Sequence, residues 1–103
     1  MDLAGKTDRE KQILQGIVDV LKRELDPVRI ILFGSRAKND QRLSSDFDIA
    51  VDCQRPIFSK ELDIKNQIES LLGLYELDLI YLSAVDENFR NIILKTGTVI
   101  YER

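Results

Sequence analysis

The apolar residues near the start of the chain follow the period of an α-helix. Between residues 13 and 25 they recur at intervals of three and four. Thr7 and Glu10 have the spacing of a capping box, in which each side chain accepts a hydrogen bond from the other residue's backbone amide. The pattern predicts an amphipathic helix over residues 8–24, ended by Asp26-Pro27.

Two further helices are predicted by the same period. Ser59 is the expected N-cap of the second helix, and Gly73 is expected to end it. Ser83, together with Asp86, is expected to cap the third helix, which runs to about Lys95. The apolar residues expected to face inward from the third helix are Val85, Phe89, Ile92 and Ile93.

Four shorter segments are predicted to be strands: residues 28–33, 46–52, 75–82 and, at an edge, 98–101. In the second segment Phe47 and Ile49 are expected to face one side of the sheet, and Asp46 and Asp48 the other. The order of helices and strands predicts an α+β fold, with a small mixed β-sheet and helices packed on one face.

Composition limits both the size of the fold and its chemistry. The chain has 103 residues, 44% of them hydrophobic, so we expect a single domain over residues 1–103. It contains no histidine, which removes the commonest general base and the commonest zinc ligand. Catalysis would therefore have to use carboxylates, hydroxyls, cations or a bound metal.

Charge and cysteine content favour a cytoplasmic protein. A net charge of −3 gives no strong nucleic-acid signal. The single cysteine, Cys53, cannot form an internal disulfide, which is typical of a reducing compartment. No apolar run is long enough to span a bilayer, and the polar N-terminus is unlike a signal peptide. Composition leaves a homo- or hetero-oligomer equally open.

Acidic residues interrupt the apolar strands in a way that suggests a metal site. Asp46 and Asp48 lie on the same predicted face, roughly 7 Å apart at the backbone. Buried carboxylates need a partner, and the oxygen ligands suit a hard cation such as Mg²⁺. Asp78 would join them if its strand is a neighbour. The alternative is that these acids form the solvated face of amphipathic strands.

A glycine and a serine follow the first predicted strand. Gly34 permits a tight turn whose backbone amides can bind phosphate oxygens, and Ser35 adds a hydroxyl donor. Arg36, Lys38 and Arg42 add positive charge nearby. The P-loop pattern is missing, so an ordinary turn followed by a solvated basic loop is the alternative interpretation.

Together these motifs resemble the signature of the DNA polymerase β-like nucleotidyltransferase superfamily. The segment "GSRA" is followed by "SDFDIAV" and later by "LDLI", and the resemblance runs from about Val28 to Leu82. The chain is most similar to the minimal nucleotidyltransferases, the MntA-type antitoxins of HEPN/MNT pairs. One departure is that family members often have Arg-Gly after "GSRA", where this chain has Lys38 and Asn39.

The resemblance implies roles for individual residues. Catalytic and metal-binding roles map to Asp46, Asp48 and Asp78, and nucleotide binding maps to Gly34, Ser35 and Arg36. The aspartates would hold one or two Mg²⁺ ions on ATP, and Asp78 would help to deprotonate the attacking hydroxyl. The glycine, serine and arginine would contact the phosphates.

The resemblance also implies a partner. The expected reaction moves AMP from ATP to a hydroxyl, typically of a tyrosine, on a helical HEPN ribonuclease toxin, and the chain then acts as an antitoxin. One alternative is a non-catalytic binding module that neutralises the HEPN partner by contact. Another is nucleotidyl transfer to a small molecule such as an aminoglycoside, for which so short a chain lacks an obvious second lobe.

Overall fold

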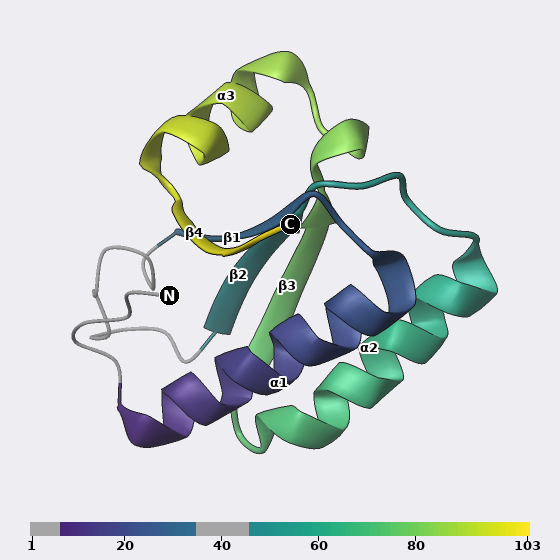
Figure 1. Ribbon diagram of the computed structural model, residues 1–103, viewed down its shortest axis with the longest axis vertical. Helices are drawn as coiled ribbons and strands as arrows, with labels where there is room; N and C mark the ends of the chain where they lie inside the picture. Colours follow the sequence, from purple (N-terminus) through teal and green to yellow (C-terminus); the bar gives the residue numbers. More distant parts are fainter. Residues whose placement is uncertain (1–6, 35–45) are drawn as a thin grey trace.

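The computed structural model describes residues 7–34 and 46–103, apart from the side chain of Asp46. Its elements are α1 (Asp8–Leu25), β1 (Arg29–Phe33), β2 (Asp46–Val51), α2 (Phe58–Leu72), β3 (Glu76–Tyr81), the 3-10 turn η1 (Leu82–Ala84), α3 (Glu87–Thr96) and β4 (Thr98–Glu102) (Figure 1). The predicted order of helices and strands is confirmed.

The four strands form one mixed sheet. Their order is β3-β2-β1-β4, so β3 and β4 are the edge strands. β1 pairs antiparallel with β2 and β4, whereas β3 runs parallel to β2. A parallel neighbour requires a crossover connection, which α2 provides. The predicted α+β fold with a small mixed sheet is therefore confirmed.

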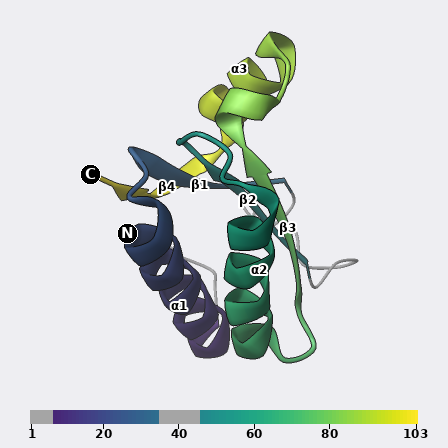
Figure 2. The same ribbon diagram turned by 90° about the vertical axis from the view of Figure 1, so that its right-hand side faces the viewer.

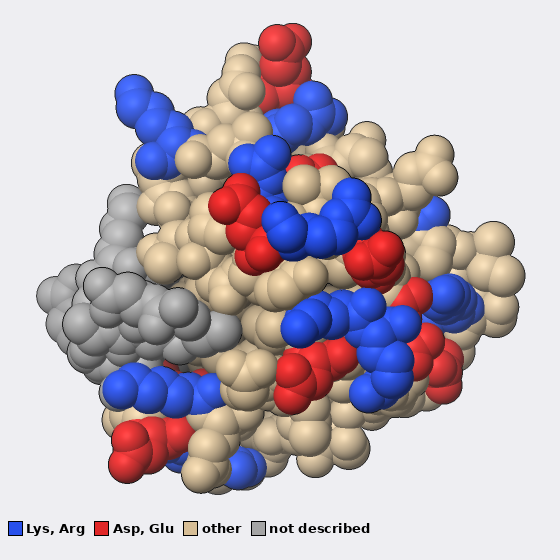
Figure 3. All heavy atoms as spheres, in the orientation of Figure 1, with Lys and Arg blue, Asp and Glu red and all other residues tan. Residues whose placement is uncertain are grey.

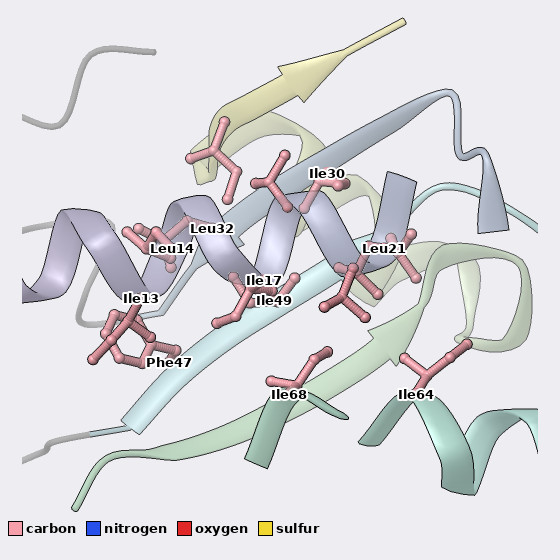
Figure 4. Close-up of a cluster of buried hydrophobic side chains, with 14 of the residues drawn as sticks. Ile13, Leu14, Ile17, Leu21, Ile30, Leu32, Phe47, Ile49, Ile64 and Ile68 are labelled. Atoms are coloured by element: carbon pink, nitrogen blue, oxygen red, sulfur yellow. The ribbon is translucent and has the colours of Figure 1, made fainter. Parts of the chain in front are cut away.

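The main core lies between the sheet and the two long helices. Figure 2 shows α1 and α2 side by side on one face of the sheet. In Figure 4, Ile17 and Leu21 of α1 meet Ile49 of β2 and Ile64 and Ile68 of α2, and all five side chains are 0% exposed. Burying each such side chain contributes about 1.5–3 kcal/mol, so this layer holds the sheet in place.

The third helix, α3, lies on the opposite face of the sheet (Figure 2). The predicted packing of the helices on one face of the sheet therefore holds for α1 and α2 and is wrong for α3. Ile93 is the buried residue of α3, and it packs with Ile31 and Ala50. The expectation that Ile92 faces inward is wrong, because it is 57% exposed. Phe89 is 38% exposed but packs its ring edge-to-face against Phe33 of β1, as expected for an inward-facing residue. This helix is short and covers only part of its face.

The predicted capping box of α1 is confirmed. The side chains of Thr7 and Glu10 each accept a 3.1 Å hydrogen bond from the other residue's backbone amide. The helix ends at Leu25, where Asp26 adopts a left-handed φ of 45° and its amide donates to the carbonyl of Lys22. Local sequence signals therefore define both ends of α1.

The caps of the other two helices differ from the prediction. Ser59 does not cap α2, because the helix begins at Phe58 and Ile57 occupies the N-cap position without a side-chain hydrogen bond. Asp86 caps α3 with its carboxylate, whereas Ser83 belongs to the preceding η1 turn. Both predicted serines lie within one turn of the N-cap position that the structure shows.

Candidate functional site

One row of residues across the sheet carries the candidate site. Phe33 of β1 lies opposite Asp48 of β2, and Asp48 lies beside Asp78 of β3 in the strand register. Residues paired in this way point to the same face, and neighbouring strands are about 4.8 Å apart. The structure thus places Asp48 and Asp78 side by side, although they are far apart in the sequence.

The next row of the same face is apolar. It consists of Ile31, Ala50 and Ile80, which pair across the strands and belong to the small cluster under α3. Asp48 is half-buried, and Asp78 is exposed. The two carboxylates therefore lie at the open end of a face that α3 closes further along, which explains why acids occur in an otherwise apolar strand.

The turn after β1 brings backbone against one of these carboxylates. Gly34 has a φ of 74°, a left-handed conformation that favours glycine. A methyl group added at Gly34 would collide with Oδ2 of Asp48 and lie 3.1 Å from its Cγ. Glycine is therefore required both by the turn and by the position of the Asp48 carboxylate.

The remaining predicted site residues fall partly outside the described region. Asp46 pairs with Glu76 in the register of β2 and β3, and its side chain is not described. Ser35 and Arg36 lie in the segment 35–45, outside the described residues. Glu76 is an additional acid at this edge that sequence reasoning did not include. Its position depends on the pairing of β2 with β3, which no local motif reveals.

The described residues offer part of a metal site. Within 7–34 and 46–103, no group of three or more His, Cys, Asp or Glu side chains gathers closely enough to hold a metal ion. Asp48 and Asp78 nevertheless supply neighbouring carboxylate oxygens, the ligands that Mg²⁺ prefers. Because Gly34 has no side chain, the backbone of the turn can lie against the Asp48 carboxylate. These features fit Mg²⁺, with Asp46 as the third predicted ligand.

The two residues that follow β2 have structural roles. Asp52 accepts a 2.9 Å hydrogen bond from Nε of Arg29 and so forms a salt bridge. Burial and the neighbouring Asp52 carboxylate raise the pKa of the Cys53 thiol. A thiol with a raised pKa is a poor nucleophile at neutral pH, so Cys53 fits a packing role.

A buried tyrosine lies at the end of β3. Tyr81 is 4% exposed, and within the described part of the chain its hydroxyl has no hydrogen-bond partner. Burial, together with the nearby Glu61 carboxylate, raises the pKa of Tyr81 to about 12. Glu61 itself is hydrogen-bonded by Arg55, which lowers the pKa of that carboxyl. Tyr81 therefore stays neutral at physiological pH.

The charged side chains are mixed in sign on the face seen in Figure 3, where basic and acidic groups alternate over the described residues. This face gives no continuous basic surface of the kind that nucleic-acid backbones bind.

Among the helices described here, none combines the length and the apolar composition needed to cross a membrane.

Sequence comparison finds relatives over most of the chain. The family described as "Polymerase beta, Nucleotidyltransferase" matches residues 15–103. Two candidate protein adenylyltransferases of Methanocaldococcus jannaschii, MJ1217 and MJ1379, are 37% identical over 71 residues and 38% identical over 73 residues. Each match covers 68% of this chain, and 71% and 72% of the respective relatives.

Solved structures share the fold. A chain in a toxin–antitoxin crystal structure with AMP-PNP has a TM-score of 0.73 and 21% identity, covering 94% of this chain and 75% of that chain. A candidate minimal nucleotidyltransferase has a TM-score of 0.70 and 23% identity, covering 88% and 94%. A chain in the complex of tri-AMPylated Shewanella oneidensis HEPN toxin with MNT antitoxin has a TM-score of 0.67 and 20% identity, covering 92% and 73%.

Proposed function

Because this chain belongs to the polymerase β nucleotidyltransferase family, we propose that it transfers AMP from ATP to a hydroxyl of a partner protein. The partner is a helical HEPN-type toxin, the acceptor hydroxyl is that of a tyrosine, and the chain is the antitoxin. The observation that carries the proposal is the adjacent pair Asp48 and Asp78, with the Gly34 turn against Asp48.

The comparisons support the choice of acceptor. Relatives at 37% and 38% identity carry the name of protein adenylyltransferases, which act on proteins. One structural neighbour is a complex in which the HEPN toxin is AMPylated and the other component is an MNT antitoxin. A protein hydroxyl is therefore a better supported acceptor than a small molecule.

The proposed reaction is an in-line displacement at phosphorus. The acceptor hydroxyl oxygen attacks the α-phosphorus of ATP, the bond from that phosphorus to the bridging oxygen breaks, and pyrophosphate leaves. The hydroxyl proton passes to a carboxylate oxygen of Asp78. Such reactions depend on positioning and charge neutralisation, so the lack of histidine is no obstacle.

Two groups of residues bind the nucleotide in this proposal. Asp46, Asp48 and Asp78 would hold Mg²⁺, which supplies charge neutralisation at the phosphates when it is bound. The backbone of the Gly34 turn orients the β- and γ-phosphates, because a glycine lets them approach the chain closely. Ser35 and Arg36 contribute a hydroxyl donor and a positive charge to the same phosphates.

The proposal is tested with the chain, ATP, Mg²⁺ and a HEPN-type toxin protein. We expect the intact mass of the HEPN protein to increase by AMP. Asp48→Asn should lower the rate about a hundredfold or more, because it removes a carboxylate from the phosphate site. Asp19→Asn, an exposed change on α1 at the other face of the sheet, is the control.

The same variants separate catalysis from simple binding. If Asp48→Asn protects cells from the toxin as well as the parent does, while the toxin carries no AMP, then contact alone neutralises the toxin and the proposal is wrong. If an aminoglycoside is modified in place of the HEPN protein, the assignment of a protein acceptor is wrong.

A further inference from the structure

The outer edge of β3 has no strand beside it in the described part of the chain. Among the strands that the structure describes, β3 is the last of the sheet and pairs only with β2, on its inner side (Figure 1). The backbone amide and carbonyl groups on the outer side of an edge strand can pair with another polypeptide. Because β3 carries Asp78, this edge adjoins the candidate site.

A groove follows this edge between β3 and α2. Its larger part has a volume of about 430 Å³ and lies between Lys65 of α2 and Glu76 and Leu77 of β3. A smaller part of about 90 Å³ continues from Lys65 and Leu77 to Asp78 and Tyr81. Because the two parts share Lys65 and Leu77, the β3-edge groove accompanies the strand along its length.

The β3-edge groove is acidic. The charged residues that line it among those described are Glu61, Glu69, Glu76, Asp78 and Lys65. Arg55 lies 2.8 Å from the Glu61 carboxylate and compensates its charge. Three acidic residues, Glu69 on α2 and Glu76 and Asp78 on the edge strand itself, then remain against the one ammonium group of Lys65. This excess of negative charge favours a basic occupant.

An apolar surface adjoins the groove on α2. Phe58 is 76% exposed and Leu62 is 47% exposed. Phe58 is three residues before Glu61, and Leu62 is three residues before Lys65, so both lie on the same side of the helix as the groove. An occupant of the groove can therefore bury apolar side chains here while its basic groups meet the carboxylates.

We propose that an extended, basic segment of the acceptor protein docks in the β3-edge groove as an additional strand. This inference rests on the proposed function, because it states how the acceptor reaches that site. Side chains of an added strand alternate between the two faces of the sheet. One set contacts Phe58 and Leu62, and the other lies beside Asp78, about 4.8 Å away across the strands. An acceptor hydroxyl in the second set faces the candidate general base.

The test uses a synthetic peptide that alternates lysine and valine around a central tyrosine. A matched peptide has glutamate in place of lysine. Hydrogen exchange of the backbone amides in Glu76–Tyr81 is measured without nucleotide. We expect the lysine peptide to slow exchange in β3 and the glutamate peptide to leave it unchanged.

Charge reversal gives a matched control on the two edges of the sheet. Glu69→Lys with Glu76→Lys should weaken binding of the lysine peptide about tenfold, because repulsion replaces attraction. Glu102→Lys, on the opposite edge strand β4, should leave the affinity unchanged. Equal weakening by Glu102→Lys, or exchange in β3 that the lysine peptide does not slow, overturns the docking proposal.

Three further outcomes test the docking proposal and keep it separate from the proposed function. Protection of β3 that grows with protein concentration in the absence of peptide would assign the edge to a second copy of the chain and overturn the docking proposal. Docking of the lysine peptide without any AMP transfer to the HEPN protein contradicts the proposed function alone. AMP transfer that Glu69→Lys and Glu76→Lys leave unchanged contradicts the docking proposal alone.

Discussion

At the scale of single residues, the site depends on a close approach between backbone and carboxylate. Gly34 has the left-handed conformation and lies where any side chain would meet Asp48. The glycine therefore has two separable roles, one in the turn and one in leaving space beside the acid. A second glycine with positive φ, Gly73, has the first role without the second, since a methyl group added there would lie 3.5 Å from Nη2 of Arg9, an ordinary contact distance.

Replacing these two glycines separates the roles. Gly34→Ala should cost about 1–2 kcal/mol in the free energy of unfolding and weaken ATP binding at least about tenfold, because the methyl group displaces Asp48. Gly73→Ala should cost a similar stability and leave ATP affinity unchanged. Urea unfolding and calorimetric titration with ATP measure both quantities. Unchanged ATP affinity in Gly34→Ala would contradict the role of this turn in nucleotide binding.

Tyr81 makes the stability of the fold sensitive to alkaline pH. Its pKa is raised from 10.0 to about 12, so the native state holds the proton more tightly than the unfolded chain does. The resulting stability is complete below pH 10 and is lost as the pH rises through 12, by about 3 kcal/mol. Tyr81→Phe should remove this loss and, since the hydroxyl has no hydrogen-bond partner among the described residues, keep or raise stability at pH 7. Urea unfolding of both proteins at a series of pH values measures this difference. The free energy of unfolding of the parent should fall relative to that of Tyr81→Phe above pH 10. An equal fall in both proteins would refute this account.

At the scale of elements, α3 is attached to the sheet by few contacts. Ile93 is 1% exposed, whereas its neighbour Ile92 is 57% exposed. Gly97 at the end of the helix packs against Ile31 and the Leu32 carbonyl, which lets α3 approach β1 closely. Phe89 reaches the candidate site row through an edge-to-face contact with Phe33, with 6.1 Å between ring centroids.

A pair of isoleucine substitutions tests which side of α3 is inward. Ile93→Ala should lower the free energy of unfolding by about 2–4 kcal/mol, because it leaves a cavity between α3 and the sheet. Ile92→Ala should change it by less than about 0.5 kcal/mol, since that side chain is largely in water. Chemical denaturation of the two variants gives both numbers. Similar losses at the two positions would show that α3 sits in another orientation.

At the scale of the whole molecule, the sequence predicted what local patterns encode. The capping box of Thr7 and Glu10 and the alternation around Asp48 are visible within a few residues. The partnership of Asp48 with Asp78 could be stated only as a condition, because it depends on the parallel pairing of β2 and β3. The placement of α3 on the second face could not be predicted either, because it depends on packing between segments that are distant in the sequence.

The central claim is that this fold cleaves ATP between the α- and β-phosphates and passes the AMP to a protein. The most direct measurement incubates the chain and the HEPN protein with ATP labelled on either the α- or the γ-phosphate. Label from the α-phosphate should appear on the HEPN protein and be absent when Asp48 is replaced by asparagine, while label from the γ-phosphate should never appear. Transfer of the γ-label, or no label from either position while the toxin is neutralised, would contradict the claim.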